Sequence, residues 1–318
     1  MTMTGVTMSR MLQTAEHLVP RRYRVVHTTA YQYNDDVNGC YERGLLAPRD
    51  TPSQRVVHSS YQVAPPATIA FEHVDYFGNM SHYLEIQARH THLEVTKDLV
   101  VDVAWPVISM EHLNQWTVQQ AAQAIGRKPA LGVERSLYGM ASAKVATTDE
   151  VVDYAHSRLN PDQGLGEALE ALTLGIFDEF TYRPGVTTTR TTLAELLELR
   201  QGVCQDFAHL AIGCLRLFGL PARYVSGYIE TMPPPGQPKL AGSDATHAWA
   251  SVLVPDGTWI DIDPTNAHFA DSRYVVSGWG RDFADVSPLK GVIFTEANTS
   301  SLTVAVDVAR VDDLLSRG

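Results

Sequence analysis

The chain has 318 residues, of which 44% are hydrophobic and 19% are charged, so it is long enough for two domains with separate cores. Its 25 basic and 36 acidic residues give a net charge of −11, which argues against nucleic acid as a partner. Three cysteines are too few for a disulfide framework and suit a reducing compartment. No segment has the apolar length of a signal peptide or a membrane span, so we expect a cytoplasmic protein without a membrane partner.

The first third of the chain has the pattern of a β domain. Segments 82–87 and 93–96 alternate between β-prone and polar residues, which is typical of strands in a β-sandwich-like domain. Near the C-terminus, alternating Leu302, Val304, Val306 and Val308 predict a strand that returns to a sheet.

Helical patterns give way to strands from about residue 149, which is the order of an α+β domain. We therefore expect five parts in chain order. They are a disordered or weakly ordered N-terminus (1–20), an N-terminal β domain (21–104), a connecting helical segment (105–148), an α+β core (149–295), and a C-terminal strand and tail (296–318).

The α+β part contains a helix that begins near a cysteine. From Phe207 onward apolar residues recur at spacings of three and four, and Gly219 with Pro221 ends the pattern. Cys204 therefore lies in the first turn, where unpaired N–H groups and the helix dipole favour a nucleophilic thiolate. A buried core thiol is the alternative, and Cys214, on the apolar stripe, fits that alternative better.

Two strands that follow this helix are joined by the turn-forming Pro255-Asp256-Gly257. A three-residue loop places Asp263 opposite Trp249 and makes His247 its diagonal neighbour on the same face. A two-residue loop would put these side chains on opposite faces, so we predict the three-residue register or a bulged equivalent. The two strands are predicted at 246–254 and 258–263.

A helix-start cysteine, a strand histidine and a carboxylate on the next strand are the parts of a thiol acyl-transfer site. The segments that carry them closely resemble the core of transglutaminase-like cysteine enzymes, in that superfamily's order Cys, His, Asp. The resemblance implies a papain-like/transglutaminase-like core, in which Cys204 is the nucleophile, His247 the general base and Asp263 the orienting carboxylate. It covers roughly residues 150–295 and rests on segments 202–208, 219–228, 247–249 and 263–266.

Further segments resemble a bacterial subgroup of this superfamily with an added N-terminal β region. They are 23–33, 46–49, 75–79 and 280–289. The three catalytic positions show no departure from the superfamily's pattern, so the resemblance does not indicate an inactive copy.

Several neighbours of these three positions have two possible roles. Asp261 shares a strand face with Asp263, and the family motif favours Asp263 because it precedes a proline. Asp206 is expected to cap the helix or pair with an arginine. His209 lies about 140° around the helix from Cys204, so it should not face the sulfur and is expected to lie at the surface or to have a hydrogen-bonded structural role.

Trp249, Tyr182 and Gln205 are the substrate-binding candidates. Trp249 and Trp259 would either line an acyl-binding groove or pack the hairpin. Tyr182 would border the site, as the family likeness suggests, or anchor a turn. The proline-rich loop at 230–246 is a lid or a connector. The Cys204 N–H is one expected oxyanion donor, and the sequence does not identify the second.

These features predict cysteine-dependent acyl chemistry on the amide bonds of a peptide or protein, through a thioester. Hydrolysis is favoured over amine transfer because water needs no dedicated pocket. The alternatives are transglutaminase-type protein cross-linking and a non-catalytic protein-interaction module on the same fold. No C-x-x-C, H-x-x-x-H or D-x-D-x-D-G pattern is present, so we expect no metal and no cofactor. The sequence does not indicate an oligomeric state.

Overall fold

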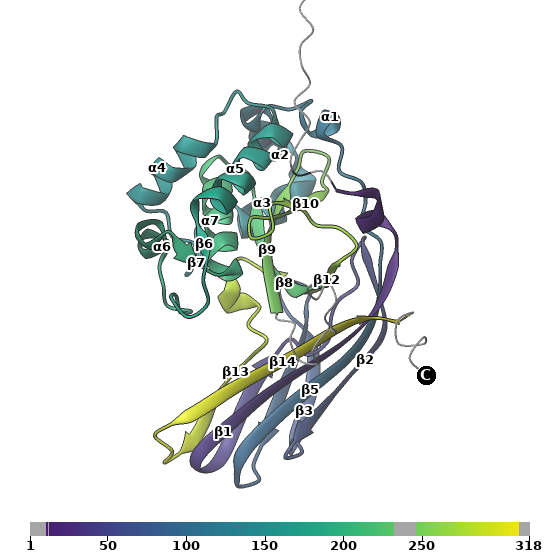
Figure 1. The fold of residues 1–318 in the computed structure, drawn as a ribbon, viewed down its shortest axis with the longest axis vertical. Coiled ribbons are helices and arrows are strands. Elements are labelled where there is room, and N and C mark those ends of the chain that lie inside the picture. The colour runs from purple at the N-terminus through teal and green to yellow at the C-terminus, as the bar shows by residue number, and fades with distance from the viewer. Residues whose placement is uncertain (1–10, 12, 232–245, 312–318) are drawn as a thin grey trace, which may run out of the picture. The chain divides into compact units, whose positions relative to one another are not determined.

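The computed structural model describes residues 11, 13–231 and 246–311 (Figure 1). The chain divides into two compact units, each assembled from three segments. The helical unit comprises Met1–His17, Val107–Tyr224 and Ala248–Ala270, and the β unit comprises Leu18–Pro106, Val225–His247 and Asp271–Gly318. Most of the segment expected to be disordered, 1–20, and most of the loop at 230–246 lie outside the described residues.

Helix α7 lies at the centre of the helical unit, and α4, α5 and α6 each pack against it. All eleven residues from Asp206 to Arg216 are buried, as expected of a helix enclosed by others. The helix begins at Cys204, as predicted, and ends before Gly219, whose φ of +75° gives the left-handed turn that terminates many helices. The helices of this unit are α1 (Met110–Leu113), α2 (Val118–Arg127), η2 (Pro129–Leu131), α3 (Gly132–Tyr138), α4 (Asp149–Arg158), α5 (Leu165–Glu179), α6 (Leu193–Leu199) and α7 (Cys204–Leu217), with η1 (Ala15–Leu18) near the N-terminus.

Short strands complete the helical unit, and two strands continue from one unit into the other. A five-stranded sheet has the order β11-β10-β9-β8-β12, and β6 pairs with β7 separately. The strands are β6 (Thr181–Tyr182), β7 (Gln201–Gly202), β8 (Ala222–Ile229), β9 (Thr246–Leu253), β10 (Trp259–Asp263), β11 (His268–Phe269) and β12 (Tyr274–Gly280). The unit boundary falls within β8 and within β9.

A single long strand, β1, organises the β unit. Its first half pairs with β5 and β14, and its second half pairs with β4 and β13. Each edge of β1 changes partner near Val37, from β5 to β4 between Val37 and Cys40 and from β14 to β13 between Tyr33 and Val37. The strands are β1 (Arg21–Gly44), β2 (Gln54–Ala64), β3 (Ile69–Val74), β4 (Met80–Ile86), β5 (His90–Val103), β13 (Leu289–Thr295) and β14 (Ser300–Arg310), with η3 (Phe283–Asp285) before β13.

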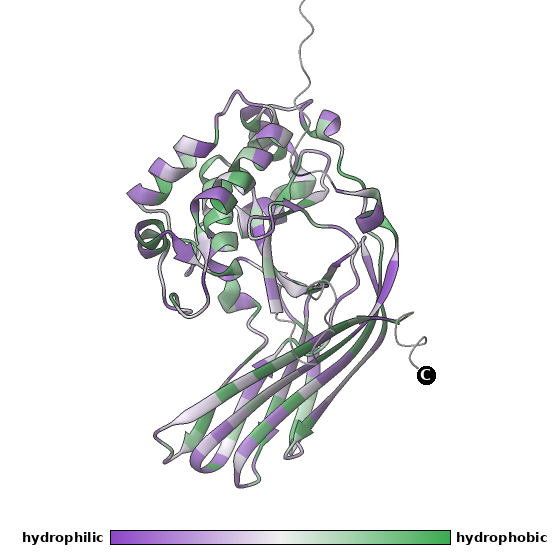
Figure 2. Cartoon of the chain, in the orientation of Figure 1, coloured by the Kyte–Doolittle hydropathy of each residue, from purple (hydrophilic) through white to green (hydrophobic). Residues whose placement is uncertain are grey.

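One hydrophobic cluster of this unit combines strands from both halves of the sheet. Leu84 and Ile86 of β4 pack in one cluster with Leu93 and Val95 of β5, although β4 and β5 do not pair directly. The long strands alternate between hydrophobic and hydrophilic residues, as predicted for the N-terminal region (Figure 2). The predicted C-terminal strand is confirmed as β14, whose Val306 and Val308 are buried.

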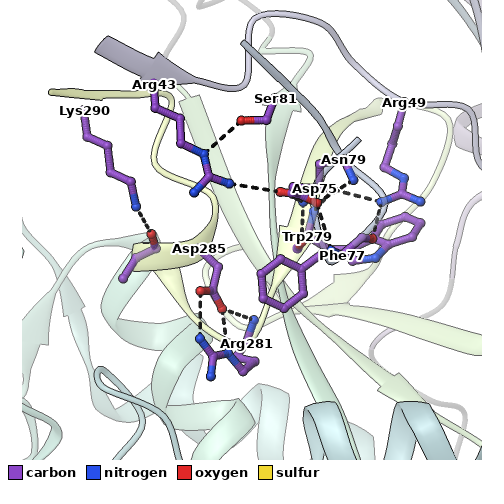
Figure 3. A network of polar contacts seen from close by, with 11 residues as sticks. Arg43, Arg49, Asp75, Phe77, Asn79, Ser81, Trp279, Arg281, Asp285 and Lys290 are labelled. Carbon is purple, nitrogen blue, oxygen red and sulfur yellow. Dashed lines mark hydrogen bonds and ion pairs between the residues drawn. The ribbon is translucent and has the colours of Figure 1, made fainter. Parts of the chain in front are cut away.

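A buried asparagine connects three segments that are far apart in the sequence (Figure 3). Asn79 is fully buried, and its Nδ2 donates to the Trp279 carbonyl at 2.8 Å and to Asp75 Oδ2 at 3.2 Å. Its Oδ1 accepts from the Trp279 N–H at 3.0 Å and from Arg49 Nη1 at 2.9 Å. The Arg49 guanidinium also lies over the Trp279 ring, 3.5 Å from its centroid. A Cβ at Gly278 would approach Asn79 Oδ1 to 2.8 Å, so a glycine leaves room for this contact.

We expect Asn79→Ala to lower the free energy of unfolding by about 2–4 kcal/mol, because the Trp279 N–H and C=O both lose a buried partner. Urea denaturation measures this change. Asn298→Ala, at an exposed asparagine that makes one side-chain bond to Asn34, is the control and should cost less than about 0.5 kcal/mol. Equal losses for the two variants would contradict the role of Asn79.

A buried glutamate at the end of β8 holds the beginning of β1 and the end of β14. Glu230 accepts from Arg21 Nη1 at 2.7 Å, from Tyr23 Oη at 2.8 Å and from Arg310 Nε at 2.6 Å. Burial acts to raise the pKa of Glu230, but the bonds from Arg310 and Tyr23 and the two guanidinium charges outweigh it and lower this pKa. The Glu230 carboxylate therefore stabilises the folded state when it is ionised.

We expect Glu230→Gln to destabilise the protein by about 3 kcal/mol at pH 7, because Arg21 stays buried without its counter-charge. Since the folded-state pKa is lowered, this stabilisation is present above the unfolded pKa of about 4.3 and is lost as the pH falls through the folded value. Denaturation of both proteins at pH 7 and below pH 4 should show the difference shrinking in acid. Asp98→Asn, which removes the exposed ion pair with Arg24, should cost below about 1 kcal/mol.

Candidate active site

Cys204 is the first residue of α7, and its side chain is partly exposed, whereas Cys40 and Cys214 are buried. All three thiols are free. Burial raises the pKa of the Cys40 and Cys214 thiols, and the Glu42 carboxylate raises that of Cys40 further. The predicted packing role of Cys214 is confirmed, because this residue has no exposed surface.

The start of α7 is held by Asp206. The Asp206 carboxylate accepts from the Val203 N–H at 2.9 Å and from Thr187 Oγ1 at 2.7 Å. Burial raises the pKa of Asp206, and these two bonds act in the opposite direction. A Cβ at Gly202 would come within 2.8 Å of Asp206 Oδ2, so glycine gives the carboxylate its space. The predicted capping role of Asp206 is therefore confirmed.

Tyr182 lies beside the residues that precede Cys204. Strands β6 and β7 are parallel, Tyr182 is the partner of Gly202, and the Arg183 N–H donates to the Gly202 carbonyl at 2.8 Å. Burial raises the pKa of Tyr182, and the nearby Cys204 sulfur raises it further. Half of the Tyr182 side chain is nevertheless exposed (51%), and its ring packs edge-on to Phe207. The ring thus presents a free surface next to the beginning of α7.

The hairpin of β9 and β10 has the predicted three-residue register. The Val254 N–H donates to the Thr258 carbonyl at 3.0 Å, and Ile262 is the partner of Ala250. One further step of this register places Asp263 opposite Trp249. This places Trp249, Asp261 and Asp263 on one face of the hairpin.

The two carboxylates of β10 have different partners. Asp261 Oδ1 accepts from Trp249 Nε1 at 3.0 Å. Burial raises the pKa of Asp261, although the Arg223 charge and the Trp249 bond lower it. Asp263 is fully buried, and its carboxylate accepts from the Thr265 N–H at 2.8 Å and from Asn266 Nδ2 at 2.7 Å. Asp261 is therefore an acceptor for Trp249 across the hairpin, whereas the turn after β10 holds the Asp263 carboxylate in one orientation.

The contact between Asn266 and Asp263 was not predicted from the sequence. The Asn266 backbone N–H, at 3.3 Å from Asp263 Oδ1, and the Asn266 side-chain amide both point to the Asp263 carboxylate. An Asp followed three residues later by Asn at a strand end is a signal that could have indicated such a turn.

His247 is the second residue of β9 and is 7% exposed. Its ring packs against Tyr274 at the start of β12, with 6.0 Å between the ring centroids. The Tyr274 carbonyl in turn accepts from Trp105 Nε1 at 3.1 Å. No sequence pattern indicated Tyr274, because it lies 27 positions after His247 and follows no common period.

The other residues considered from the sequence pack against neighbouring side chains or lie partly buried. Trp249 is fully buried, and the Trp259 ring lies edge-on to Tyr138 with the Arg223 guanidinium over it, 4.0 Å from the centroid. Gln205 is half-buried in the first turn of α7. His209 is buried, and its ring lies 4.9 Å from that of Tyr224, in agreement with the structural role predicted for it.

Within the described residues, no group of three or more His, Cys, Asp or Glu side chains is arranged to hold a metal ion. In the same part of the chain, every helix is too short or too polar to cross a bilayer.

Comparison with known proteins identifies the family. Residues 152–264 match the transglutaminase-like superfamily, and residues 23–102 match the bacterial transglutaminase-like N-terminal region. An uncharacterized protein of Mycobacterium tuberculosis is 43% identical over 295 residues, which are 90% of this chain and 92% of the relative. The chain belongs to the transglutaminase-like superfamily. The predicted family and the α+β, papain-like/transglutaminase-like fold are confirmed.

Two further proteins extend the comparison. An uncharacterized protein of Mycobacterium leprae is 31% identical over 293 residues, covering 91% of this chain and 99% of that protein. A crystal structure from Cytophaga hutchinsonii, provisionally named a cysteine protease, superposes with a TM-score of 0.73 at 22% identity. It covers 92% of this chain and 91% of that one, and at this identity it shows the shared fold.

We expect iodoacetamide at about pH 7 to modify Cys204 at least about tenfold faster than Cys40 or Cys214, because those two are buried and protonated. Peptide mapping by mass spectrometry after timed quenching measures the three rates. In denaturant the three rates should converge. Rapid modification of Cys40 or Cys214 in the folded protein would contradict the burial of these thiols.

Proposed function

We propose that this protein cleaves amide bonds of peptides or proteins with Cys204 as nucleophile, His247 as general base and Asp263 as the carboxylate that orients the imidazole. The observation that carries the proposal is the position of Cys204. It is a partly exposed thiol on the first residue of a buried helix, in a core whose resemblance to the transglutaminase-like superfamily implies a nucleophilic cysteine at this position.

The reaction would proceed in two steps. The Cys204 sulfur attacks the amide carbon while His247 takes up the thiol proton, and the resulting oxyanion collapses to a thioester. The amine leaves with the proton that the imidazole returns to it. A second nucleophile then attacks the thioester, with His247 accepting its proton, and the thiol is regenerated. The Cys204 backbone N–H is the proposed first donor to the oxyanion.

Roles are also proposed for Asp263, Tyr182 and Gln205. The buried Asp263 carboxylate has fixed donors from the turn after β10, so its orientation toward an imidazole would be fixed. Tyr182, exposed beside β7, is the proposed contact for the acyl side of the substrate. Gln205 is a proposed second contact in the first turn of α7.

Water is the proposed acceptor, because it needs no binding pocket of its own. Transfer to an amine is the second candidate, and one relative supports it. A protein-glutamine gamma-glutamyltransferase of Pseudomonas aeruginosa is 31% identical over 104 residues, which are 30% of this chain and 16% of that protein. The free state of all three thiols fits the reducing cytoplasm, which we propose as the location.

We expect Cys204→Ala to lower turnover of an active peptide at least about 10³-fold, with little change in the melting temperature, because the partly exposed thiol contributes little packing. The matched control is Cys214→Ala, which should keep its activity per folded molecule and lose about 1 kcal/mol of stability from a small cavity. Peptide cleavage assays and thermal unfolding measure both. A large loss of stability with Cys204→Ala would support a core role instead.

To identify the acceptor of the acyl group, a peptide library is incubated with and without a primary amine, and the product masses are measured by mass spectrometry. Addition of water in both samples supports hydrolysis, and incorporation of the amine supports transfer. His247→Asn should abolish either reaction and slow iodoacetamide labelling of Cys204 near neutral pH. Unchanged turnover in this variant would remove His247 from the mechanism.

A further inference from the structure

The β unit has an outer sheet face that carries large hydrophobic side chains in solvent. The face is formed by β3, β4, the second half of β1, and β13, in that order. The opposite face of the same strands is the core, where Cys40, Leu84 and Ile86 are buried. The exposed hydrophobic residues are Ile69 (46%), Phe71 (51%), Tyr41 (37%), Val292 (62%) and Phe294 (59%), which we call the outer patch.

Strand register places the outer patch in adjacent rows rather than at scattered positions. Tyr41 lies directly between Glu85 and Val292, and Ile69 lies beyond Glu85. The next row across the same four strands consists of Phe71, Tyr83, Arg43 and Lys290. Isolated apolar residues are common on protein surfaces, whereas a contiguous group of this kind is typical of an interaction surface.

Aromatic rings form a diagonal across these rows. Phe294 packs edge-on against Tyr41, with 5.8 Å between the centroids, and Tyr83 follows on the neighbouring strand one row further. Phe71 stacks on Tyr83 at 4.8 Å. Glu85 lies on one side of this diagonal and Arg43 lies on the other side, at mirrored positions.

This arrangement is complementary to itself. A two-fold axis that lies in the face along the diagonal from Tyr41 to Tyr83 exchanges the positions of Glu85 and Arg43. Each copy then sets its Glu85 over the Arg43 of the other, while the aromatic rings meet along the axis. The Arg43 side chain is 45% exposed, although it donates to Ser81 Oγ at 2.9 Å and pairs with Asp75 at 3.6 Å. Glu85 is half-buried and accepts from Gln87 Nε2 at 2.5 Å, so in the proposed dimer each side chain would add a partner to those that it already has.

We propose that the outer patch is the interface of a symmetric dimer, in which a second copy of this chain covers it face to face. The apolar residues supply the buried area, and the two Glu85–Arg43 contacts fix the orientation of the copies. Because the diagonal is oblique to the strands, the two sheets pack with crossed rather than aligned strands. The proposal is independent of the proposed catalytic function.

Sedimentation velocity over a concentration series tests the dimer. We expect wild-type protein to dimerise with a Kd of about 1–10 μM and Phe294→Glu to raise this Kd at least about 100-fold. Leu302→Glu is the matched control, because Leu302 is equally exposed (56%) but lies on β14, outside the patch, and should leave the Kd unchanged. Wild-type protein that remains monomeric at about 300 μM would overturn the proposal.

Charge reversal tests the symmetry. Glu85→Arg places two arginines against each other in both contacts, and Arg43→Glu places two glutamates there, so each variant alone should be a monomer. A one-to-one mixture restores two opposite-charge contacts and should form a mixed dimer, detected by labelling one variant with a fluorophore. Circular dichroism confirms that each variant is folded. Folded variants that fail to associate on mixing, or that dimerise alone, would contradict the proposed two-fold axis.

Discussion

The candidate site depends on the register between β9 and β10. Side chains alternate along a strand with a period of two, so a slip by one residue would turn Asp261 and Asp263 to the opposite face of the hairpin. The three-residue turn, in which Gly257 has a φ of +101°, sets that register. The hydrogen bond from Trp249 to Asp261 holds it further along the two strands.

The same hydrogen bond separates the roles of two chemically identical residues. Asp261 and Asp263 are two positions apart on one face of β10, and strand alternation alone does not distinguish their roles. A buried indole N–H needs an acceptor, and Trp249 donates to Asp261, its diagonal neighbour in this register. The Asp263 carboxylate accepts from donors of the turn that follows β10, which fix its orientation.

The β unit relies on polar contacts between distant segments. Arg49, Asn79 and Trp279 meet although 30 and 200 positions separate the asparagine from the other two. Segments 46–49, 75–79 and 280–289 resembled signatures of the bacterial subgroup, and two of the three contribute residues to this contact, with the third following directly after Trp279. In this chain these segments therefore meet at a buried amide that pairs with the backbone of β12.

Local physical rules determined much of this protein. Helix periodicity placed Cys204 in the first turn of α7, and the glycine after the helix located its end. Loop length with strand alternation predicted the register that places Asp263 opposite Trp249. Tertiary structure decided the rest. It determined that β1 changes partners along its length and that the outer patch remains exposed. It also determined that Asp261 accepts from Trp249 and that Tyr274 packs on His247. The first group depends on backbone geometry within a few residues, whereas the second depends on which distant surfaces bury the most apolar area and satisfy the most buried polar groups.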